Sequence, residues 1–170
     1  MKKIIKEIIP YIVIIFVVII IRTFIITPVQ VDGLSMYPTL NDNEILMLKK
    51  YDKNYKRFDI VVLKYQNEKL IKRIIGLPGE HIKYVDNKLY VNNKEVKENF
   101  KKNSKTNDFD ISVLFDEGET IKIPDNYYLV LGDNRNNSTD SRIIGFISKD
   151  QIEGKVKVAI FPLNKFGKIK

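Results

Sequence analysis

The stretch DIVVLKYQNEKLIKRIIGLPG, residues 59–79, gives the clearest indication of fold class in this 170-residue chain. It contains two runs rich in β-branched residues, Asp59–Tyr65 and Lys69–Ile75, with a polar segment between them and Pro-Gly after them. Runs of this kind, bounded by turn residues, are typical of β-strands. Similar runs predict further strands at Gln30–Val31, Glu44–Lys49, His81–Val85, Lys88–Val91, Ile121–Ile123, Tyr127–Leu131 and Val156–Phe161. The fold class is therefore predicted to be mainly β.

Turn signals and one longer polar stretch separate these strands. Asn-Asn at 92–93 is expected to close a hairpin. Residues Glu98–Asp110 are polar and lack a clear period, so we expect a small exposed excursion there. A short helix is also considered at Ser148–Glu153. Residues 28–170 are predicted to form one domain.

An apolar run lies ahead of the strands. Ile8–Ile21 holds 14 residues without a charge, and continuing through Arg22 to Ile26 makes 19 residues. A helix of that length reaches about 28 Å, close to the ~30 Å hydrocarbon thickness of a bilayer. Lys2, Lys3 and Lys6 precede the run, and such a terminus stays in the cytoplasm. Residues 1–27 are thus predicted to be a cytoplasmic stub and a transmembrane anchor, with residues 28–170 outside the membrane.

Two other interpretations of this run remain. A cleavable signal peptide would share the charged start and the apolar stretch, but residues 27–30 (TPVQ) lack a small-x-small cleavage site. A buried helix of a soluble domain would show a polar face, and no polar face interrupts this run. The retained anchor fits the sequence best.

The composition narrows the possible chemistry. The chain has no cysteine, which excludes disulfides, thiol catalysis and Cys-ligated zinc. His81 is the single histidine, so there is one candidate for a Ser-His-Asp triad. We expect His81 to be a strand residue without a catalytic role. No metal ion and no cofactor are expected.

The formal net charge is +8, of which residues 1–27 contribute +3 and residues 28–170 contribute +5. A basic surface suits either nucleic acid or anionic lipid. The lysines are spread along the chain with acids between them, so a position near anionic headgroups is preferred and no nucleic-acid partner is expected.

The first chemically distinctive segment is VDGLSMYPTL, residues 31–40. Ser35 follows a glycine turn and precedes a proline-fixed segment, so its backbone is stiff and exposed. A nucleophile needs such a position, because its oxygen must approach a carbonyl without a mobile chain. Taken alone, Ser35 could equally be a plain loop serine.

The second segment is KLIKRIIGLPGE, residues 69–80, read as a strand that ends in a turn. Alternation places Lys72 on one face with Leu70 and Ile74, and Arg73 on the other face. Burial would lower the pKa of a lysine and make it a base at neutral pH. Both faces are equally apolar, so alternation leaves open which basic residue is buried, and a solvated lysine remains an alternative.

The third segment is GDNRNNSTDSR, residues 132–142, a polar loop between apolar elements. Such a loop must satisfy its polar groups internally. Asp140 and Arg142 are able to pair, and Ser138 could hydrogen-bond a neighbouring base. A calcium site is the alternative, which the two arginines of the loop oppose.

In this order, the three segments and the apolar start make the chain resemble bacterial type I signal peptidases of the single-anchor, Gram-positive kind. The matching motifs lie at residues 33–40, 72–80 and 132–142, so the resemblance covers essentially the whole chain. It implies a signal-peptidase-type β catalytic domain behind one transmembrane helix. It also implies a membrane-bound serine endopeptidase that removes signal peptides from secreted preproteins.

The resemblance also implies roles for individual residues. Ser35 would be the nucleophile and Lys72 the general base of a Ser/Lys dyad, acting through an acyl-enzyme. Ser138 would orient the lysine, and Asp140 with Arg142 would form a supporting ion pair. A further residue, Met36, would border the substrate pocket.

Two departures from the family pattern affect this assignment. Some members have a serine at the position of Gly33, whose hydroxyl helps to hold the oxyanion, so here backbone N–H groups would do so. Asn136 stands where many members have an aspartate, and we assign it no catalytic role. The alternatives are an inactive membrane-tethered relative that binds signal peptides, a self-cleaving repressor, and a nucleic-acid binder. A pseudoenzyme would be expected to lack Ser35 or Lys72, and a repressor would need a DNA-binding domain.

Overall fold

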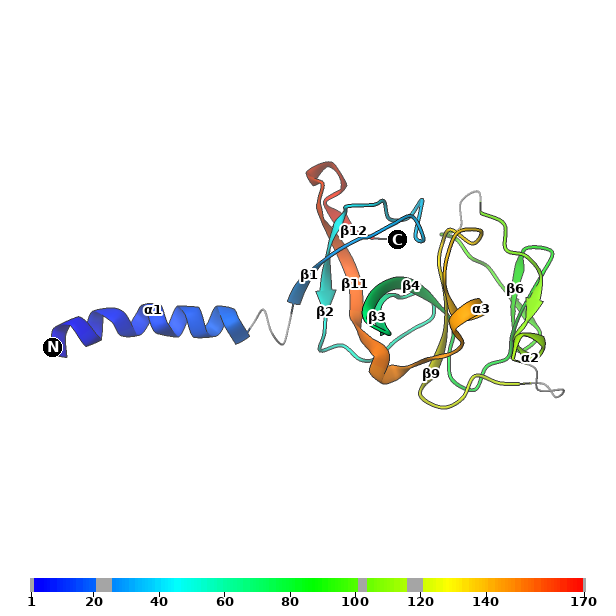
Figure 1. The fold of residues 1–170 in the computed structure, drawn as a ribbon, viewed down its shortest axis with the longest axis horizontal. Coiled ribbons are helices and arrows are strands. Elements are labelled where there is room, and N and C mark those ends of the chain that lie inside the picture. Colours follow the sequence, from blue (N-terminus) through cyan, green and yellow to red (C-terminus); the bar gives the residue numbers. More distant parts are fainter. Residues whose placement is uncertain (1, 21–25, 101–103, 116–120, 170) are drawn as a thin grey trace.

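The computed structural model describes residues 2–20, 26–100, 104–115 and 121–169. Within these ranges the chain forms an N-terminal helix followed by two β-sheets (Figure 1). The helices are α1 (Lys2–Ile20), α2 (Ile111–Leu114) and α3 (Ser141–Ile144), with 3-10 turns η2 (Lys149–Gln151) and η3 (Leu163–Lys165). The strands are β1 (Ile26–Gln30), β2 (Ile45–Lys49), β3 (Ile60–Tyr65), β4 (Glu68–Gly76), β5 (Ile82–Val85), β6 (Lys88–Val91), β7 (Lys94–Val96), β8 (Phe109–Asp110), β9 (Tyr127–Leu131), β10 (Ile147–Ser148), β11 (Ile152–Phe161) and β12 (Gly167–Lys168).

The larger sheet places its last long strand between earlier ones. The strand order is β1-β2-β11-β3-β4-β9-β10, with β12 paired to β11, and the pairings are antiparallel. Strand β11 therefore joins β2 to β3. In the β3–β4 hairpin Val61 stands opposite Lys72, and β9 pairs with the far side of β4. The strand that carries Lys72 is thus an interior strand of this sheet.

Both faces of β3 and β4 are buried. Val62 and Ile71 belong to one apolar core with residues of β2, whereas Val61 and Ile74 belong to another with residues of β9. Such strands read as continuous apolar runs instead of alternating ones. From Ile71 onward β4 is buried on both faces, so Lys72 and Arg73 are each 2% exposed although they point to opposite faces.

The smaller sheet has the order β7-β6-β5-β8. It shares a core with the larger sheet, because Ile82 and Leu89 pack with Ile75 and Leu131. Asn92 and Asn93 both have positive φ and connect β6 to β7, as the Asn-Asn turn predicts. The two sheets lie beside each other in Figure 1, with the smaller one on the side away from α1.

Several sequence-based boundaries differ from the structure. The segment 121–123 is not a strand, although the backbone of Ile123 bonds to Gly79 and Glu80. The first strand is β1 at 26–30, and the only helical part of 148–153 is the turn η2. Strand β11 begins at Ile152 and is longer than predicted. Shifts in its register allow it to pair with both β2 and β3. The short elements β7, β8, β10, β12, α2 and α3 were not predicted.

The N-terminal run forms the helix α1, and the predicted span extends beyond it. Residues 21–25 lie outside the described residues, and Ile26 begins β1. Among the described residues, no helix is both long enough and apolar enough to cross a membrane.

Candidate active site

The side chains of Ser35 and Lys72 meet although 37 residues separate them. Lys72 projects from the interior strand β4, and Ser35 lies in the turns between β1 and β2. The Nζ atom of Lys72 is 2.8 Å from the Oγ atom of Ser35. This distance is a good hydrogen bond, and it allows a proton to pass directly between the two atoms.

Burial lowers the proton affinity of the Lys72 amine. Removal from water lowers the pKa of Lys72 from 10.5 to about 8, and the nearby Asp140 carboxylate opposes this change. A fall of that size disfavours the charged amine by about 3 kcal/mol. This cost lowers the free energy of unfolding by its full amount below about pH 8, where Lys72 is charged in both states. Between about pH 8 and pH 10.5 the unfolded chain binds more protons than the folded chain, so the cost shrinks as the pH rises and is gone above pH 10.5.

The turn that carries Ser35 is held by local bonds. Gly33 has φ +82°, a conformation that suits glycine, and its N–H donates to the Asp42 carboxylate at 2.8 Å. The N–H of Tyr37 donates to the carbonyl of Leu34, which tightens the turn around Ser35. The N–H of Gly33 is therefore already engaged.

Met36, expected from the resemblance to border the substrate pocket, is a core residue in the structure. Its side chain is 1% exposed and packs in the core with Val31, Leu40 and Leu46. It anchors the turn from below and is not among the residues that line the cavity beside Ser35.

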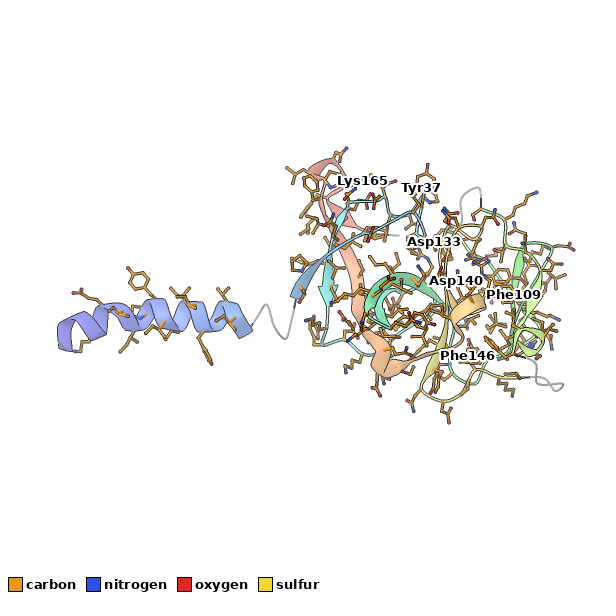
Figure 2. All side chains as sticks on the ribbon, in the orientation of Figure 1. Tyr37, Phe109, Asp133, Asp140, Phe146 and Lys165 are labelled. Carbon is orange, nitrogen blue, oxygen red and sulfur yellow. The ribbon has the colours of Figure 1, made fainter. Side chains whose placement is uncertain are left out.

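The polar loop 132–142 completes the site from the other side. The N–H of Asn134 donates to the Ser35 carbonyl at 3.0 Å, and the Asn134 side-chain amide donates to the Leu34 carbonyl at 3.1 Å. This loop joins β9 to α3, and Figure 2 shows Asp133 and Asp140 on it. The nucleophile turn and the loop are thus fixed to each other by direct bonds.

Asp140 and Arg142 form the ion pair that the sequence suggests. Arg142 donates to both oxygens of the Asp140 carboxylate at 2.8 Å. Asp140 also caps α3 and accepts the N–H of Gly132 at 3.0 Å. Its carboxylate therefore ties the start of the loop to its end.

Ser138 is placed close to the dyad without a hydrogen bond. Its hydroxyl is buried and has no partner within the described part of the chain. It packs against Gly132 so closely that an added Cβ there would overlap the Ser138 Oγ atom and lie 2.5 Å from the Ser35 carbonyl. The bond to Lys72 that the resemblance implies is not formed here.

A second buried ion pair joins all three segments. Arg73 donates to both oxygens of the Asp133 carboxylate at 2.9 and 2.6 Å, and the Thr39 hydroxyl donates to the same carboxylate at 2.5 Å. Asp133 and Asp140 are both occupied by arginines, so the loop does not present free carboxylates to calcium. Within the described residues, no group of histidine and acidic side chains converges to hold a metal ion.

A cavity of about 440 Å³ opens beside the dyad. Its lining residues are Asp32, Gly33, Leu34, Ser35, Leu70, Lys72, Asn136, Asn137, Ser138, Thr139 and Ile143. The cavity therefore makes Ser35 and Lys72 accessible to a ligand. Its walls include apolar side chains and asparagine amides. Asn136 lines this cavity, and nothing in its position adds a proton-transfer group.

His81 is engaged elsewhere. It precedes β5, and its Nε2 atom lies 2.7 Å from the Asp110 carboxylate and 3.3 Å from the Ser112 hydroxyl. Because one nitrogen makes both contacts, this cluster lacks the two-sided relay of a Ser-His-Asp triad.

Within residues 98–100 and 104–110, two polar side chains are less exposed than the sequence suggests. Glu98 and Thr106 are buried against Arg135 of the polar loop. Sequence patterns do not predict these contacts, because polar residues without a period carry no information about distant partners. Thr39 and Asp133 were likewise assigned no role, although both lie within the recognised motifs.

Comparisons with known proteins agree with this geometry. The model of the family "Signal peptidase, peptidase S26" matches residues 1–161. A signal peptidase I of Bacillus amyloliquefaciens is 43% identical over 160 residues, covering 89% of this chain and 85% of that protein. Signal peptidase I S of Bacillus subtilis (strain 168) is 44% identical over 156 residues, covering 87% and 84%.

A solved structure also matches. The crystal structure of a signal peptidase I from Enterococcus faecalis V583 is 36% identical, with a TM-score of 0.53, and the match covers 60% of this chain and 96% of that one. Family match, relatives and fold agree over most of the sequence. The chain therefore belongs to the signal peptidase, peptidase S26 family.

Proposed function

We propose that this protein is a membrane-bound serine endopeptidase that removes N-terminal signal peptides from secreted preproteins. The observation that carries the proposal is the 2.8 Å contact between the Ser35 hydroxyl and the buried Lys72 amine. The lowered pKa of Lys72, about 8, gives a usable fraction of neutral amine at physiological pH. The curated relatives named signal peptidase I support the substrate class.

Neutral Lys72 takes the proton of Ser35 as the Ser35 oxygen attacks the scissile carbonyl. The C–N bond then breaks, Lys72 returns the proton to the leaving amine, and an acyl-enzyme remains on Ser35. Water activated by the same lysine hydrolyses the ester and restores both residues. Backbone N–H groups, including that of Ser35, hold the oxyanion, since Gly33 has no hydroxyl and its own N–H binds Asp42.

We also propose that the apolar part of α1, which starts at Ile8, anchors the enzyme in the cell membrane, with residues 28–170 on the outer side. The large apolar side chains from Ile8 to Ile19 of α1 are all exposed, and a lipid environment would cover them. Ser35 follows Ile26 by nine residues, a tether of at most ~30 Å. The nucleophile would therefore work close to the surface where a signal-peptide cleavage site emerges.

Incubation of a model preprotein with the detergent-solubilised enzyme tests the function, with the cut position read by mass spectrometry. Ser35→Ala and Lys72→Ala are each expected to abolish cleavage with the circular dichroism spectrum unchanged. Lys69→Ala is the matched control, because Lys69 lies on the same strand with its side chain 54% exposed. Wild-type cleavage by either dyad variant would contradict the proposal.

A further inference from the structure

Arg135 is a buried cation in the polar loop that the reaction itself does not use. Its side chain is fully buried, and its Nε–H donates to the Gly132 carbonyl at 3.0 Å. Its Nη1 donates to the Tyr84 hydroxyl at 2.9 Å and to the Thr106 hydroxyl at 2.7 Å. A guanidinium in this position requires a counterion, because a buried unpaired charge is strongly unfavourable.

Glu98 supplies that counterion from outside the three motifs. Its carboxylate accepts from Arg135 Nη2 at 2.6 Å, and its side chain is 5% exposed. Tyr84 donates its hydroxyl to the same carboxylate at 2.7 Å, and burial raises the pKa of Tyr84 well above 10, which keeps it a donor. The backbone N–H of Arg135 donates to the Ser104 hydroxyl at 2.9 Å. Ser104 therefore holds the backbone of Arg135, as Glu98 holds its side chain.

The backbone of the loop 132–142 connects Arg135 to Ser35 and Asp140. The carbonyl that Arg135 binds belongs to Gly132, whose N–H binds Asp140. Gly132 lies so close to the Ser138 hydroxyl and the Ser35 carbonyl that an added Cβ would overlap both. The N–H of Asn134, just before Arg135, holds the Ser35 carbonyl. The guanidinium therefore fixes the turn that sets the position of the nucleophile.

We infer that Glu98, through Arg135, is a positioning residue for cleavage, and that Glu98, Ser104 and Thr106 together form a clamp on the loop 132–142. The inference rests on the proposed function and adds a residue to it that lies outside the three family motifs. With Glu98 neutralised, Arg135 loses its counterion and turns toward water. The Gly132 carbonyl is then released, and the contacts of the loop with Ser35 and Asp140 loosen.

Steady-state cleavage of a model preprotein by the full-length enzyme in detergent tests the clamp. Glu98→Gln is expected to lower kcat about tenfold or more with KM within about twofold, because substrate binding is kept while the dyad is displaced. The midpoint of the rise of kcat/KM with pH is expected to move upward, since a displaced loop admits water to Lys72. Glu95→Gln is the matched control, because Glu95 makes an exposed pair with Lys88 and is 43% exposed.

A double variant separates positioning from a simple loss of stability. Glu98→Leu combined with Arg135→Met removes both charges and keeps similar volumes, so the melting temperature is expected to approach that of the wild type. Its kcat is expected to stay low, because the Gly132 carbonyl still lacks the hydrogen bond from Arg135.

The clamp is overturned if Glu98→Gln keeps wild-type kcat, or if its activity falls only with the folded fraction at an unchanged pH midpoint. Recovery of kcat in the double variant overturns it as well. Ser35→Ala in the same assay tells the two proposals apart: if Ser35→Ala still cleaves, the proposed function fails. If Ser35→Ala is inactive and Glu98→Gln behaves as wild type, only the clamp fails.

Discussion

In the proposed mechanism, Lys72 makes the rate of this enzyme depend on pH in a defined direction. Only the neutral amine accepts the Ser35 proton, and burial lowers the pKa of Lys72 to about 8. We therefore expect kcat/KM to rise with increasing pH, with a midpoint near pH 8. A pH profile of kcat/KM on a model preprotein measures this. A midpoint near 6.5 would indicate the ordinary pKa of a histidine and would point to His81 instead.

Gly132 is a residue whose lack of a side chain the site requires. An added Cβ would overlap the Ser138 hydroxyl and press on the Ser35 carbonyl. Gly132→Ala is expected to reduce kcat about 100-fold or more, because displacement of the nucleophile by a fraction of an ångström misaligns the dyad. The kcat on a preprotein, alongside the melting temperature, checks this result. Wild-type kcat in Gly132→Ala would show that the loop tolerates the shift.

At this scale the motifs predicted part of the site and missed the rest. Short motifs carry Ser35, Lys72, Asp140 and Arg142, and the structure brings Ser35 to Lys72 and Asp140 to Arg142. The hydrogen bond that ties Asp133 to Thr39, 94 residues away, is not predicted by these motifs. Pairs at such separations depend on the three-dimensional path of the chain, which local patterns do not encode.

Strand β11 adapts to its two neighbours at Gly154, where the register with β3 shifts. An added Cβ at this position would overlap the Lys49 carbonyl of β2. Gly154→Ala is expected to lower the free energy of unfolding by about 1–3 kcal/mol, because backbone must move to relieve the overlap. Thermal or denaturant unfolding measures the change.

Glu153→Ala is the control for this variant, since Glu153 makes a half-exposed pair with Lys69 worth at most about 1 kcal/mol. An unfolding transition of Gly154→Ala equal to that of Glu153→Ala would contradict the close approach of β11 to β2.

The long strands were predictable, and the short ones were not. The predictions at 59–65 and 69–75 match β3 and β4 almost residue for residue, since their β-branched runs are long and bounded by turns. The two-residue strands β8, β10 and β12 exist because a neighbour is available to pair with them. Ile121–Ile123 has strand-like composition, but its bonds go to the 79–80 turn.

The whole chain combines a basic catalytic domain with an apolar N-terminal helix. The proposed anchor, the apolar part of α1, would confine the enzyme to the plane that holds its substrate and raise the effective concentration of both. Removal of residues 1–25 is expected to slow cleavage of a vesicle-bound preprotein about tenfold or more, with a short soluble peptide cut at nearly the same rate. Parallel assays on the two substrates measure the ratio.

An equal loss of rate on both substrates would indicate damage to the domain, and no loss on either would contradict the anchor.

The position of β11 between β2 and β3 has a consequence for the order in which the site assembles during synthesis. Before residues 152–161 are synthesised, β2 and β3 have no strand between them. The segment with the nucleophile and the segment with the base then belong to separate halves of a nascent polypeptide. Ser35 and Lys72 are therefore expected to reach their hydrogen-bonding distance only once residues 152–161 have been made and have joined the two halves of the sheet.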